Sequence, residues 1–470
     1  MTETLRCDVA IIGAGTAGLA AERAARSNGA TTLLIDPHFN GTTCATVGCM
    51  PSKLLIAASN AAHSVRSAEQ FGIAVGDVRI DGRAVMRRIQ TERDRFVKLT
   101  QDSIAEIPDG IRLCGLAKFV DDHTLSLHDG RTIKADSIVI ATGSSPTVPK
   151  AFAKLNSRIL TNETIFDLED FPASLAVIGS GSIGLEIAHA MARLGVDVTL
   201  FDKSDRLGGI RCDKVHAALK AAIEKDVRLV LSVNVHPSGA EEGIRFEWTG
   251  ASKGDTTFDY ALVATGRSPN LDSLNLAATG LLLDDDGVPE HDRGTMRCAD
   301  SSIFLAGDAA HDLPLLHEAS HDGAIAGRNA VAFPATIKAE RFTPFGITFT
   351  GPPVARIGKS EDEGVITGTA DFSDQGRARV EGVNQGVLTL YAAAPDGRLI
   401  GADLFTPASE HLAHIIAWAV QQGHTATQLL EMPFYHPTIE EGLKSALRTI
   451  CSATPLTLPS NQDRGAPSGA

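Results

Sequence analysis

The sequence predicts an α/β fold with two Rossmann-like, doubly wound parallel-sheet domains that bind dinucleotides, followed by a smaller C-terminal α+β domain. Two observations lead to this prediction. A pattern of strand, glycine-rich turn and helix occurs twice, and from about residue 342 the chain changes to short alternating strands. The length of 470 residues exceeds the size at which one hydrophobic core usually stops growing, so several domains are expected.

The composition excludes several classes of protein. The 44 glycines and 43% hydrophobic residues suit a globular α/β chain with many tight turns. A net charge of -14 without a run of Lys or Arg argues against a nucleic-acid or anionic-membrane partner. No stretch has the length and apolarity of a membrane span, and the seven scattered cysteines do not resemble a secreted disulfide framework. We therefore expect a cytoplasmic protein.

The first glycine-rich turn follows a mostly apolar strand at residues 8–12, which we expect to be buried on both faces. Gly13 permits the tight turn, Gly15 lets the backbone approach a pyrophosphate, and Gly18 allows close packing of the next helix. The following strand ends at Asp36, where a carboxylate would accept hydrogen bonds from an adenosine ribose. A lone GxGxxG also occurs in ordinary turns, but this complete order of elements favours a dinucleotide site.

The same pattern recurs in the segment LAVIGSGSIG. Its three glycines are Gly179, Gly181 and Gly184. Asp202 ends the next strand and favours the free 2′-hydroxyl of NAD over the phosphate of NADP. Lys203 and Arg206 lie close by and weaken that preference, although we interpret them as solvated surface charges.

Two cysteines, Cys44 and Cys49, lie just after the first dinucleotide pattern. Their spacing exceeds one helical turn, so the sulfurs can meet only where the backbone forms a distorted turn or a helix start; Gly48 and Pro51 favour such a bend. A disulfide that closes so short a loop adds little stability. Two reduced buried thiols, or half of a zinc site, remain alternatives. A zinc site would need two further Cys or His ligands at short spacing, and none occur nearby. We therefore expect no metal.

The segment GTTCATVGCMPSK resembles the CxxxxC redox signature of the class I pyridine nucleotide-disulfide oxidoreductases, and within them the dihydrolipoamide dehydrogenase branch. The resemblance implies FAD at the first turn and NAD at the second. It also implies that Cys49 is the charge-transfer thiolate facing the flavin, while Cys44 exchanges with the substrate. Lys53 matches the family's lysine near the flavin, and Glu186 matches the acidic partner of that lysine.

The resemblance extends along residues 5 to 450. It adds further cofactor-binding candidates, which are Gly115, Thr142 and Gly143, Gly266 and Arg267, and Gly307 and Asp308. It implies an FAD-binding domain of residues 1–150 and 276–340, an NAD(P)-binding domain of residues 151–275, and a C-terminal dimerisation domain of residues 341–453. We expect residues 454–470, rich in Ser, Pro and Gly, to be disordered. His317 matches a family histidine, and we interpret it as structural.

The last motif is FYHPTIEEG, in which His436 and Glu441 resemble the family's HPTxxE dyad. Histidine titrates near neutral pH, and a carboxylate can fix its tautomer, so the pair suits proton transfer to and from a dithiol. Phe434 and Tyr435 depart from the residues common in dihydrolipoamide dehydrogenases, as Thr42 departs from GGTC. These departures concern the mouth of the substrate site more than its chemistry.

The sequence therefore predicts a homodimeric flavoprotein that transfers electrons between a dithiol and NAD(H) by a ping-pong mechanism. Dihydrolipoamide is the favoured substrate, either free or as a lipoyl group on another protein. Alternatives are an NAD(P)H-dependent reductase of another small disulfide, a flavin NADH oxidase or transhydrogenase, and a non-catalytic subunit of a 2-oxo acid dehydrogenase complex.

Overall fold

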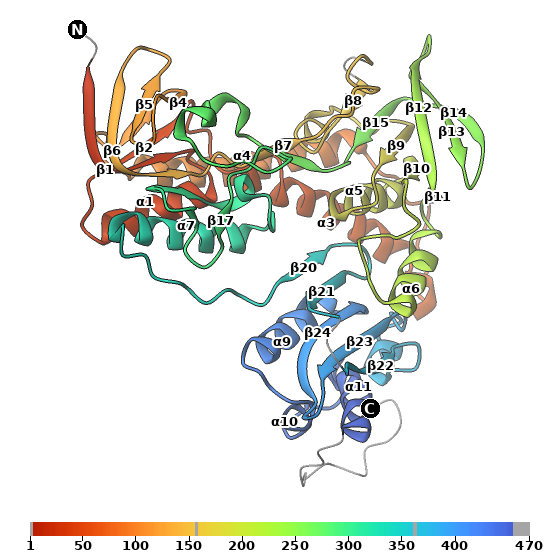
Figure 1. Cartoon of the computed structure of the whole chain (residues 1–470). Coiled ribbons are helices and arrows are strands. Elements are labelled where there is room, and N and C mark those ends of the chain that lie inside the picture. Colours follow the sequence, from red (N-terminus) through yellow and green to blue (C-terminus); the bar gives the residue numbers. More distant parts are fainter. Residues whose placement is uncertain (1–2, 156–157, 361–363, 455–470) are drawn as a thin grey trace. The chain divides into compact units, whose positions relative to one another are not determined.

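The computed structural model describes residues 3–155, 158–360 and 364–454 (Figure 1). The chain divides into two compact units. The first unit comprises residues 1–51, 87–147 and 266–341, and the second comprises residues 52–86, 148–265 and 342–470. Apart from Thr454, the predicted tail of residues 454–470 lies outside the described residues.

The α-helices have the following bounds. They are α1 (Thr16–Ser27), α2 (Thr43–Thr46), α3 (Cys49–Arg66), α4 (Gly82–Ala105), α5 (Ser182–Arg193), α6 (Asp213–Ile223), α7 (Leu316–Ala332), α8 (Gly376–Val380), α9 (Ser409–Gln421), α10 (Ala426–Leu430) and α11 (Leu443–Ala453). Short 3-10 helices are η1 (Ala68–Phe71), η3 (Ile165–Asp167), η4 (Asp272–Leu274), η5 (Leu276–Thr279), η6 (Gly307–Ala310) and η7 (Glu440–Gly442).

The strands of the first unit form a nine-stranded sheet and a two-stranded ribbon. The sheet contains β1 (Thr4–Ile12), β2 (Thr32–Asp36), β3 (Arg112–Cys114), β4 (Ala117–Phe119), β5 (Thr124–Leu127), β6 (Thr132–Ile140), β17 (His291–Asp292), β18 (Arg297–Cys298) and β19 (Ile303–Leu305). The ribbon pairs β7 (Ser144–Pro146) with β16 (Arg267–Pro269).

Strand β1 lies inside the parallel part of the large sheet, in the order β19-β6-β1-β2-β3. Its last residues are buried on both faces, as predicted. Val9 and Ile11 belong to one hydrophobic cluster, and Ala10 and Ile12 belong to the cluster on the opposite side. In a sheet of this kind, dinucleotides bind at the carboxyl ends of the strands. The glycine-rich turn begins at that end of β1.

Helices α1 and α7 lie side by side against this sheet (Figure 1). Small residues allow the close approach: a Cβ at Gly323 would lie 2.1 Å from the Ala17 carbonyl oxygen, and one at Gly327 would lie 2.3 Å from that of Ala21. The two helices therefore meet through backbone and small side chains.

The second unit repeats the arrangement in a five-stranded parallel sheet, ordered β11-β10-β9-β15-β8. Its strands are β8 (Ile159–Leu160), β9 (Ser174–Ile178), β10 (Asp197–Phe201), β11 (Arg228–Val230) and β15 (Tyr260–Val263). An antiparallel sheet of β12 (Val233–Gly239), β13 (Ile244–Gly250) and β14 (Gly254–Phe258) follows β11. The aromatic rings of Phe201, Phe246 and Phe258 pack together in the shared core.

The predicted α+β character of the C-terminal part is confirmed. Five antiparallel strands form a sheet in the order β20-β21-β24-β23-β22. They are β20 (Phe345–Thr348), β21 (Val354–Gly358), β22 (Ile366–Asp371), β23 (Val387–Ala393) and β24 (Arg398–Phe405). Residues of α9 and α11 complete its hydrophobic core.

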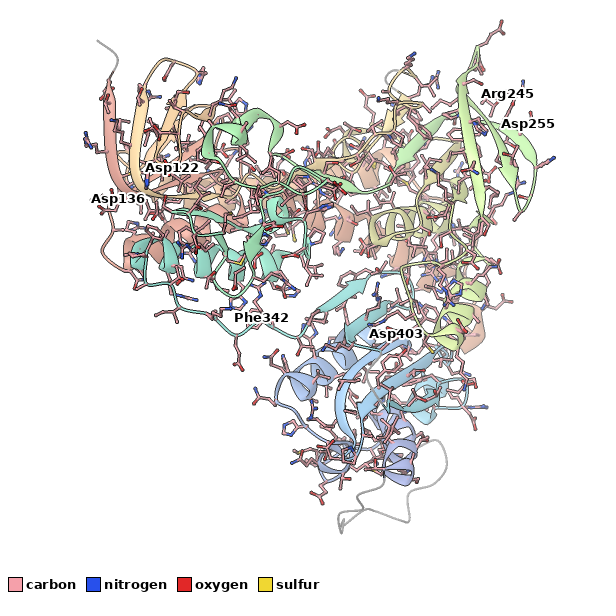
Figure 2. All side chains as sticks on the ribbon, viewed as in Figure 1. Asp122, Asp136, Arg245, Asp255, Phe342 and Asp403 are labelled. Atoms are coloured by element: carbon pink, nitrogen blue, oxygen red, sulfur yellow. The ribbon has the colours of Figure 1, made fainter. Side chains whose placement is uncertain are left out.

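Asp403 of β24, labelled in Figure 2, is fully buried and joins this sheet to the chain before α6. Its carboxylate accepts hydrogen bonds from the backbone N–H groups of Arg211 and Cys212 and from the Tyr391 hydroxyl, at 3.0, 2.9 and 3.2 Å. The Arg211 guanidinium also pairs with it at 3.0 Å. The buried charge of Asp403 is well compensated by these four donors. The contact therefore holds the chain before α6 against β24.

Among the described helices, none combines the length and apolar character that crossing a bilayer requires.

Candidate active site

The first glycine-rich turn has the geometry that its sequence predicts. Gly13 has φ +103°, and a Cβ there would lie 2.4 Å from the Ala141 carbonyl oxygen. A Cβ at Gly18 would lie 1.7 Å from the Gly13 carbonyl oxygen, so only glycine lets α1 pack this closely on the turn. Gly15 caps α1 without a side-chain hydrogen bond, and the space beside its Cα is open within 4 Å.

Asp36 has a second task that sequence reasoning missed. Its Oδ2 accepts a hydrogen bond from Ala14 N at 2.9 Å, and its Oδ1 accepts from His38 N and Phe39 N at 2.9 and 2.8 Å. The carboxylate therefore holds the glycine-rich turn and the chain that leads to the cysteines. A carboxylate has about four acceptor positions, so one remains for a ribose hydroxyl.

The second turn repeats this geometry. Gly179 has φ +105°, and a Cβ there would lie 2.4 Å from the Ala264 carbonyl oxygen. A Cβ at Gly184 would lie 1.9 Å from the Gly179 oxygen, whereas Gly181 has open space beside it. The carbonyls of Ala141 and Ala264, which exclude a Cβ at Gly13 and Gly179, each begin an Ala-Thr-Gly segment, so the repeat includes the strand beside the turn as well as the glycines.

Asp202 directly follows β10 and binds the second turn more tightly than Asp36 binds the first. Its Oδ2 accepts from both the backbone N and the Oγ of Ser180, at 2.6 and 2.7 Å, and its Oδ1 accepts from Ser204 N at 2.7 Å. Lys203 is exposed, and Arg206 pairs with Asp213. These contacts agree with the interpretation of both cations as surface charges.

Both turns fit a dinucleotide pyrophosphate. An uncapped helix N-terminus presents backbone N–H groups, and the open space beside Gly15 and Gly181 lets a phosphate approach them. No trio of His, Cys, Asp or Glu suited to a metal ion occurs within residues 3–155, 158–360 and 364–454. The donors and spaces available thus suit two dinucleotides.

Three predicted cofactor segments meet in the first unit. Ser144 Oγ donates to Asp308 Oδ2 at 2.8 Å. Arg267 donates twice to Ser144: its Nε donates to Ser144 Oγ at 2.9 Å, and its Nη2 donates to the Ser144 carbonyl oxygen at 2.5 Å. Asn270 N donates to the Gly143 carbonyl oxygen at 2.9 Å. Ser144 connects these segments, although it was not among the predicted site residues. Its position between the Ala-Thr-Gly segment and the following strand was the available signal.

The region around Asp308 also contains unsatisfied polar groups. The Thr142 hydroxyl is buried and has no hydrogen-bond partner among the atoms that the structure describes. Gly307, at φ +70°, donates its N–H to Asp322 Oδ2 at 3.2 Å. Arg341 lies 2.5 Å from both Asp322 and the buried Glu318. A buried hydroxyl without a partner is available to a polar group of a bound cofactor such as FAD. The Asp322, Arg341 and Glu318 group has no distinct sequence motif, and the sequence did not predict it.

Gly115 follows β3 and donates its N–H to the Asp36 carbonyl oxygen at 3.1 Å. A Cβ there would lie 3.3 Å from Leu127 Cδ1. This position beside the end of β2 is compatible with the adenosine end of a dinucleotide, and its role remains a prediction.

The cysteine pair lies at a break between two helices. Cys44 is half-buried in α2, and Cys49 is exposed at the first position of α3. Between them, a Cβ at Gly48 would lie 3.0 Å from the Thr43 carbonyl oxygen and 3.4 Å from Cys44 Cα. The expected helix start is therefore present, and a small residue at position 48 allows it. A thiol at a helix N-terminus is favoured as thiolate.

Lys53 and Glu186 form an ion pair in the second unit, with Lys53 Nζ at 2.9 and 3.0 Å from the two carboxylate oxygens. Glu186 also accepts from Ser52 Oγ at 2.8 Å and from Phe349 N at 2.9 Å. The Lys53 ammonium lies 4.4 Å from the centre of the Phe349 ring. The predicted pair thus exists, and Ser52 and Phe349 are contacts that the motif did not reveal.

His436 and Glu441 also meet as predicted. His436 Nδ1 lies 2.9 Å from Glu441 Oε2. Glu441 is 3% exposed and also accepts from Thr438 N and Lys444 Nζ, both at 3.2 Å. Burial alone would raise the pKa of Glu441, but the hydrogen bonds from Thr438, Lys444 and His436 lower it overall. With Nδ1–H directed to the carboxylate, the exposed imidazole offers Nε2 as a proton acceptor.

His317 is half-buried, 4.0 Å from Glu318.

Two family models match the chain. One, described as pyridine nucleotide-disulphide oxidoreductase, matches residues 7–323, and the dimerisation domain of the same proteins matches residues 345–447. The dihydrolipoyl dehydrogenase of Bacillus subtilis is 31% identical over 460 residues, which cover 93% of this chain and 97% of that protein. The mercuric reductase of Shigella flexneri is 34% identical over 460 residues, which cover 94% of this chain and 80% of that protein.

A solved structure shows the same fold. The HOCl-induced flavoprotein disulfide reductase RclA from Escherichia coli matches with a TM-score of 0.80 at 22% identity, over 94% of this chain and 99% of that one. At this identity the likeness concerns the architecture alone.

Proposed function

Because the chain belongs to the pyridine nucleotide-disulphide oxidoreductase family, we propose that it transfers electrons between a dithiol substrate and NAD(H) through FAD and the pair Cys44 and Cys49. Dihydrolipoamide or a protein-bound lipoyl group is the favoured substrate. The proposed location is the cytoplasm, and the proposed assembly is a homodimer through the domain at residues 345–447.

FAD and a pyridine nucleotide are the cofactors of this family. We assign FAD to the turn at Gly13, Gly15 and Gly18, with Asp36 at its ribose and Asp308 at its ribityl chain. We assign NAD to the turn at Gly179, Gly181 and Gly184, where Asp202 favours the unphosphorylated ribose. When bound at the first turn, FAD would accept two electrons from the reduced Cys44 and Cys49 and would supply a hydride to NAD at the second turn. The uncapped helix N-termini and the unsatisfied Thr142 hydroxyl support this assignment.

The thiol chemistry balances with the residues present. A substrate thiolate attacks Cys44 Sγ of the oxidised pair, which forms a mixed disulfide and releases Cys49 as a thiolate. The second substrate thiolate then attacks the substrate sulfur in the mixed disulfide, so the substrate leaves as a disulfide and Cys44 leaves as a thiolate. The dithiol gives up two protons. His436 Nε2 of a second copy takes that of the attacking thiol, with Glu441 stabilising the imidazolium, and the proton of the second thiol ends on Cys44, while Cys49 stays a thiolate.

One observation carries the proposal. His436 and Glu441 are 2.9 Å apart, the carboxylate is buried, and the imidazole is exposed. This arrangement holds the ring by Nδ1 and leaves Nε2 available to an external proton donor. A histidine with a purely structural task would be expected to direct both nitrogens into the protein.

The most direct test compares Cys44→Ser and Cys49→Ser with the control Cys114→Ser. Cys114 is an exposed cysteine of the same unit, located on β3. We expect both active-site variants to lose dithiol oxidation by at least about a thousandfold, since the nucleophile is removed. The control is expected to keep it. Undiminished turnover by Cys44→Ser would contradict the mechanism, and oxygen consumption in that variant would favour an NADH oxidase.

The substrate requires its own experiment, because the relatives include both dihydrolipoyl dehydrogenases and mercuric reductases. Steady-state rates should be compared for dihydrolipoamide, glutathione disulfide and other small disulfides with NAD(H) and NADP(H). We expect the highest kcat/KM for the lipoyl pair with NAD(H). If lipoyl substrates are inert while another disulfide reacts, the substrate proposal is wrong. A purified protein without flavin absorbance would instead favour a non-catalytic assembly subunit.

A further inference from the structure

Helix α5, which follows the second glycine-rich turn, carries a row of polar side chains on one face. Their spacing of four, three and four residues places them one above another along the helix. The row consists of Ser182, Glu186, His189 and Arg193. Apart from Ser182, these side chains are largely buried, which is unusual for three titratable groups on a helix.

Every member of this row bonds to the segment of residues 348–351, which begins at the last residue of β20. Thr348 Oγ1 donates to Ser182 Oγ at 2.7 Å, and Phe349 N donates to Glu186 Oε1 at 2.9 Å. Gly351 N donates to His189 Nδ1 at 3.2 Å, and the Gly351 carbonyl oxygen accepts from Arg193 Nη2 at 2.9 Å. The segment is thus fastened along the whole length of the helix.

This segment reaches the Lys53 and Glu186 ion pair in two ways. Its Phe349 N–H occupies one oxygen of Glu186, and its Phe349 ring lies 4.4 Å below the Lys53 ammonium. The position of residues 348–351 therefore sets both the carboxylate and the face of the aromatic ring that Lys53 contacts.

His189 is the member of the row that can change its bonding with pH. It is 3% exposed, and its Nδ1 must lack a proton in order to accept the Gly351 N–H. The proton is therefore on Nε2, which lies 3.0 Å from Asp226 Oδ2. A second proton, on Nδ1, would turn this nitrogen from an acceptor into a donor. The N–H groups of His189 Nδ1 and Gly351 would then face each other.

The charges around His189 come from several elements. Burial lowers the pKa of His189, and Arg193 on its own helix acts in the same direction, while the bond to Asp226 opposes them. Asp226 also accepts from Arg193 Nε at 3.0 Å. From α3, Arg66 donates to the Arg193 carbonyl oxygen, and burial followed by the Arg193 charge lowers the pKa of His63. The neutral imidazole is thus favoured near neutral pH.

We propose that His189 is a positioning residue for the Lys53 and Glu186 pair: in its neutral form it holds Gly351, and through residues 348–351 it keeps the Phe349 N–H on Glu186. Protonation of His189 releases Gly351 and loosens that support. The effect on the flavin rests on the proposed function, in which Lys53 corresponds to the family's lysine near the flavin. The support of Glu186 by residues 348–351 does not rest on the proposed function.

Two substitutions separate the two nitrogens of His189. His189→Asn places an amide oxygen near the position of Nδ1, so it can still accept from Gly351 but cannot reach Asp226. His189→Gln places an amide N–H near the position of Nε2, so it can reach Asp226 but leaves Gly351 N without an acceptor. Neither variant titrates. His216→Gln is the matched control, because His216 also accepts a backbone N–H, from Leu207 at 3.1 Å, but it is remote from residues 348–351 in the sequence and does not bond to them.

The first readout is hydrogen exchange of the Phe349 and Gly351 amides in the holoenzyme, expressed as protection relative to the free chain. We expect His189→Gln to reduce protection of both amides roughly tenfold at pH 7.5, and His189→Asn and the control to leave it within about threefold. In the wild type, protection should fall as the pH is lowered below about 6.5. That fall should be absent from both His189 variants and present in the control.

The second readout is the absorption spectrum of the bound flavin, with Lys53→Met as the reference for loss of the lysine. We expect His189→Gln to shift the spectrum toward that reference and His189→Asn to leave it unchanged. Equal protection of the two amides in His189→Asn and His189→Gln, or an unchanged pH dependence, would overturn the positioning role. If Lys53→Met itself leaves the spectrum unchanged, the flavin assignment of Lys53 is wrong, and the exchange data still decide the role of His189.

Discussion

The two glycine-rich turns have nearly the same backbone, but their helices are held in different ways. Gly13 and Gly179 have φ +103° and +105°, and each faces a carbonyl oxygen 2.4 Å from where a Cβ would lie. Helix α1 then packs against α7 through glycine and alanine, whereas α5 bonds to residues 348–351 through polar side chains. One nucleotide-binding geometry thus tolerates both an apolar and a polar support.

This difference has a consequence for each unit. Backbone contact through small residues does not change with pH, but it fails sterically when a methyl group is added. A polar support tolerates small changes in volume, but it depends on the protonation of its histidine and carboxylates. The two turns should therefore respond to different perturbations.

The largest effects are expected where the turns are alike. Gly13→Ala and Gly179→Ala each place a methyl group against a carbonyl oxygen at positive φ. We expect Gly13→Ala to yield protein without bound flavin, and Gly179→Ala to yield flavoprotein that NADH no longer reduces. Flavin absorbance of the purified protein and anaerobic reduction by NADH measure the two outcomes.

Gly29→Ala and Gly195→Ala are the matched controls. These glycines follow α1 and α5, have φ +89° and +98°, and have open space where a Cβ would lie. Alanine at either position has the strained positive φ but does not collide with a carbonyl oxygen. We therefore expect about 1–2 kcal/mol of destabilisation, with both cofactors retained. If the controls lose the cofactors as the turn variants do, the collision is not the cause.

The next effect distinguishes the two supports. Gly323→Ala puts a methyl group 2.1 Å from the Ala17 carbonyl oxygen, and overpacking of this kind costs about 1–3 kcal/mol. Ser182→Ala removes one hydrogen bond, to Thr348, and we expect a loss of about 1 kcal/mol. The thermal unfolding midpoint of the holoenzyme should fall more for Gly323→Ala, with earlier flavin release. The reverse order would mean that the polar support is the stronger one.

The third effect is the response to acid. In the second unit, burial lowers the pKa of His189, His63 and His216. A lowered folded-state pKa means that the unfolded chain binds the proton first, so stability is complete above about pH 6.5 and is lost as the pH falls below it. In the first unit, burial lowers the pKa of His321. Burial also lowers the pKa of His291, but its contacts with the Asp312 carboxylate and the Pro289 carbonyl oxygen together outweigh burial, so this pKa is raised. These two shifts oppose each other.

We therefore expect the second unit to lose more stability than the first between pH 7 and pH 5.5. Trp248 and Trp418 are the two tryptophans of the chain, and both lie in the second unit, so their fluorescence reports on it. Under the proposed assignment of FAD to the turn at Gly13, flavin release reports on the first unit. If both signals shift equally with pH, the polar support is not specifically sensitive to acid.

Most of the fold could be predicted from the sequence, because its landmarks are local. Positive φ at Gly13 and close packing at Gly18 follow from the residue type and its place between a strand and a helix. The pairing of His436 with Glu441 spans five residues, so a short motif was enough to reveal it. The resemblance to a family supplied the order of these landmarks, and the family models match the same order.

The supports could not be predicted, because they join residues far apart in the chain. The bond between His189 and Gly351 spans 162 positions, and the bond between Ser144 and Asp308 spans 164. On α5, the periodicity alone cannot distinguish a buried polar face from a solvated one. The bond from Ala14 N to Asp36 was also missed, because sequence reasoning assigned this carboxylate to a ribose alone.

The smallest effect concerns one of the three positions at which the two glycine-rich turns differ. Ser180 donates to Asp202 from its N and its Oγ, whereas Ala14 can donate to Asp36 only from its N. Ser180→Ala removes the side-chain donor, so that residue 180, like Ala14, donates to its aspartate only from its N–H. We expect the unfolding midpoint to fall by the equivalent of about 1 kcal/mol, and KM for NADH to change less than about threefold.

Under the proposed role of Asp202 at the NAD ribose, NADPH should be a poor substrate for Ser180→Ala, because Asp202 keeps its charge and would repel a 2′-phosphate. Ala14→Ser is the reciprocal variant, and it should leave FAD retention unchanged, since Asp36 keeps its three backbone donors. A gain in NADPH turnover by Ser180→Ala would mean that the serine hydroxyl, by fixing the direction of the carboxylate, is what allows Asp202 to select NADH.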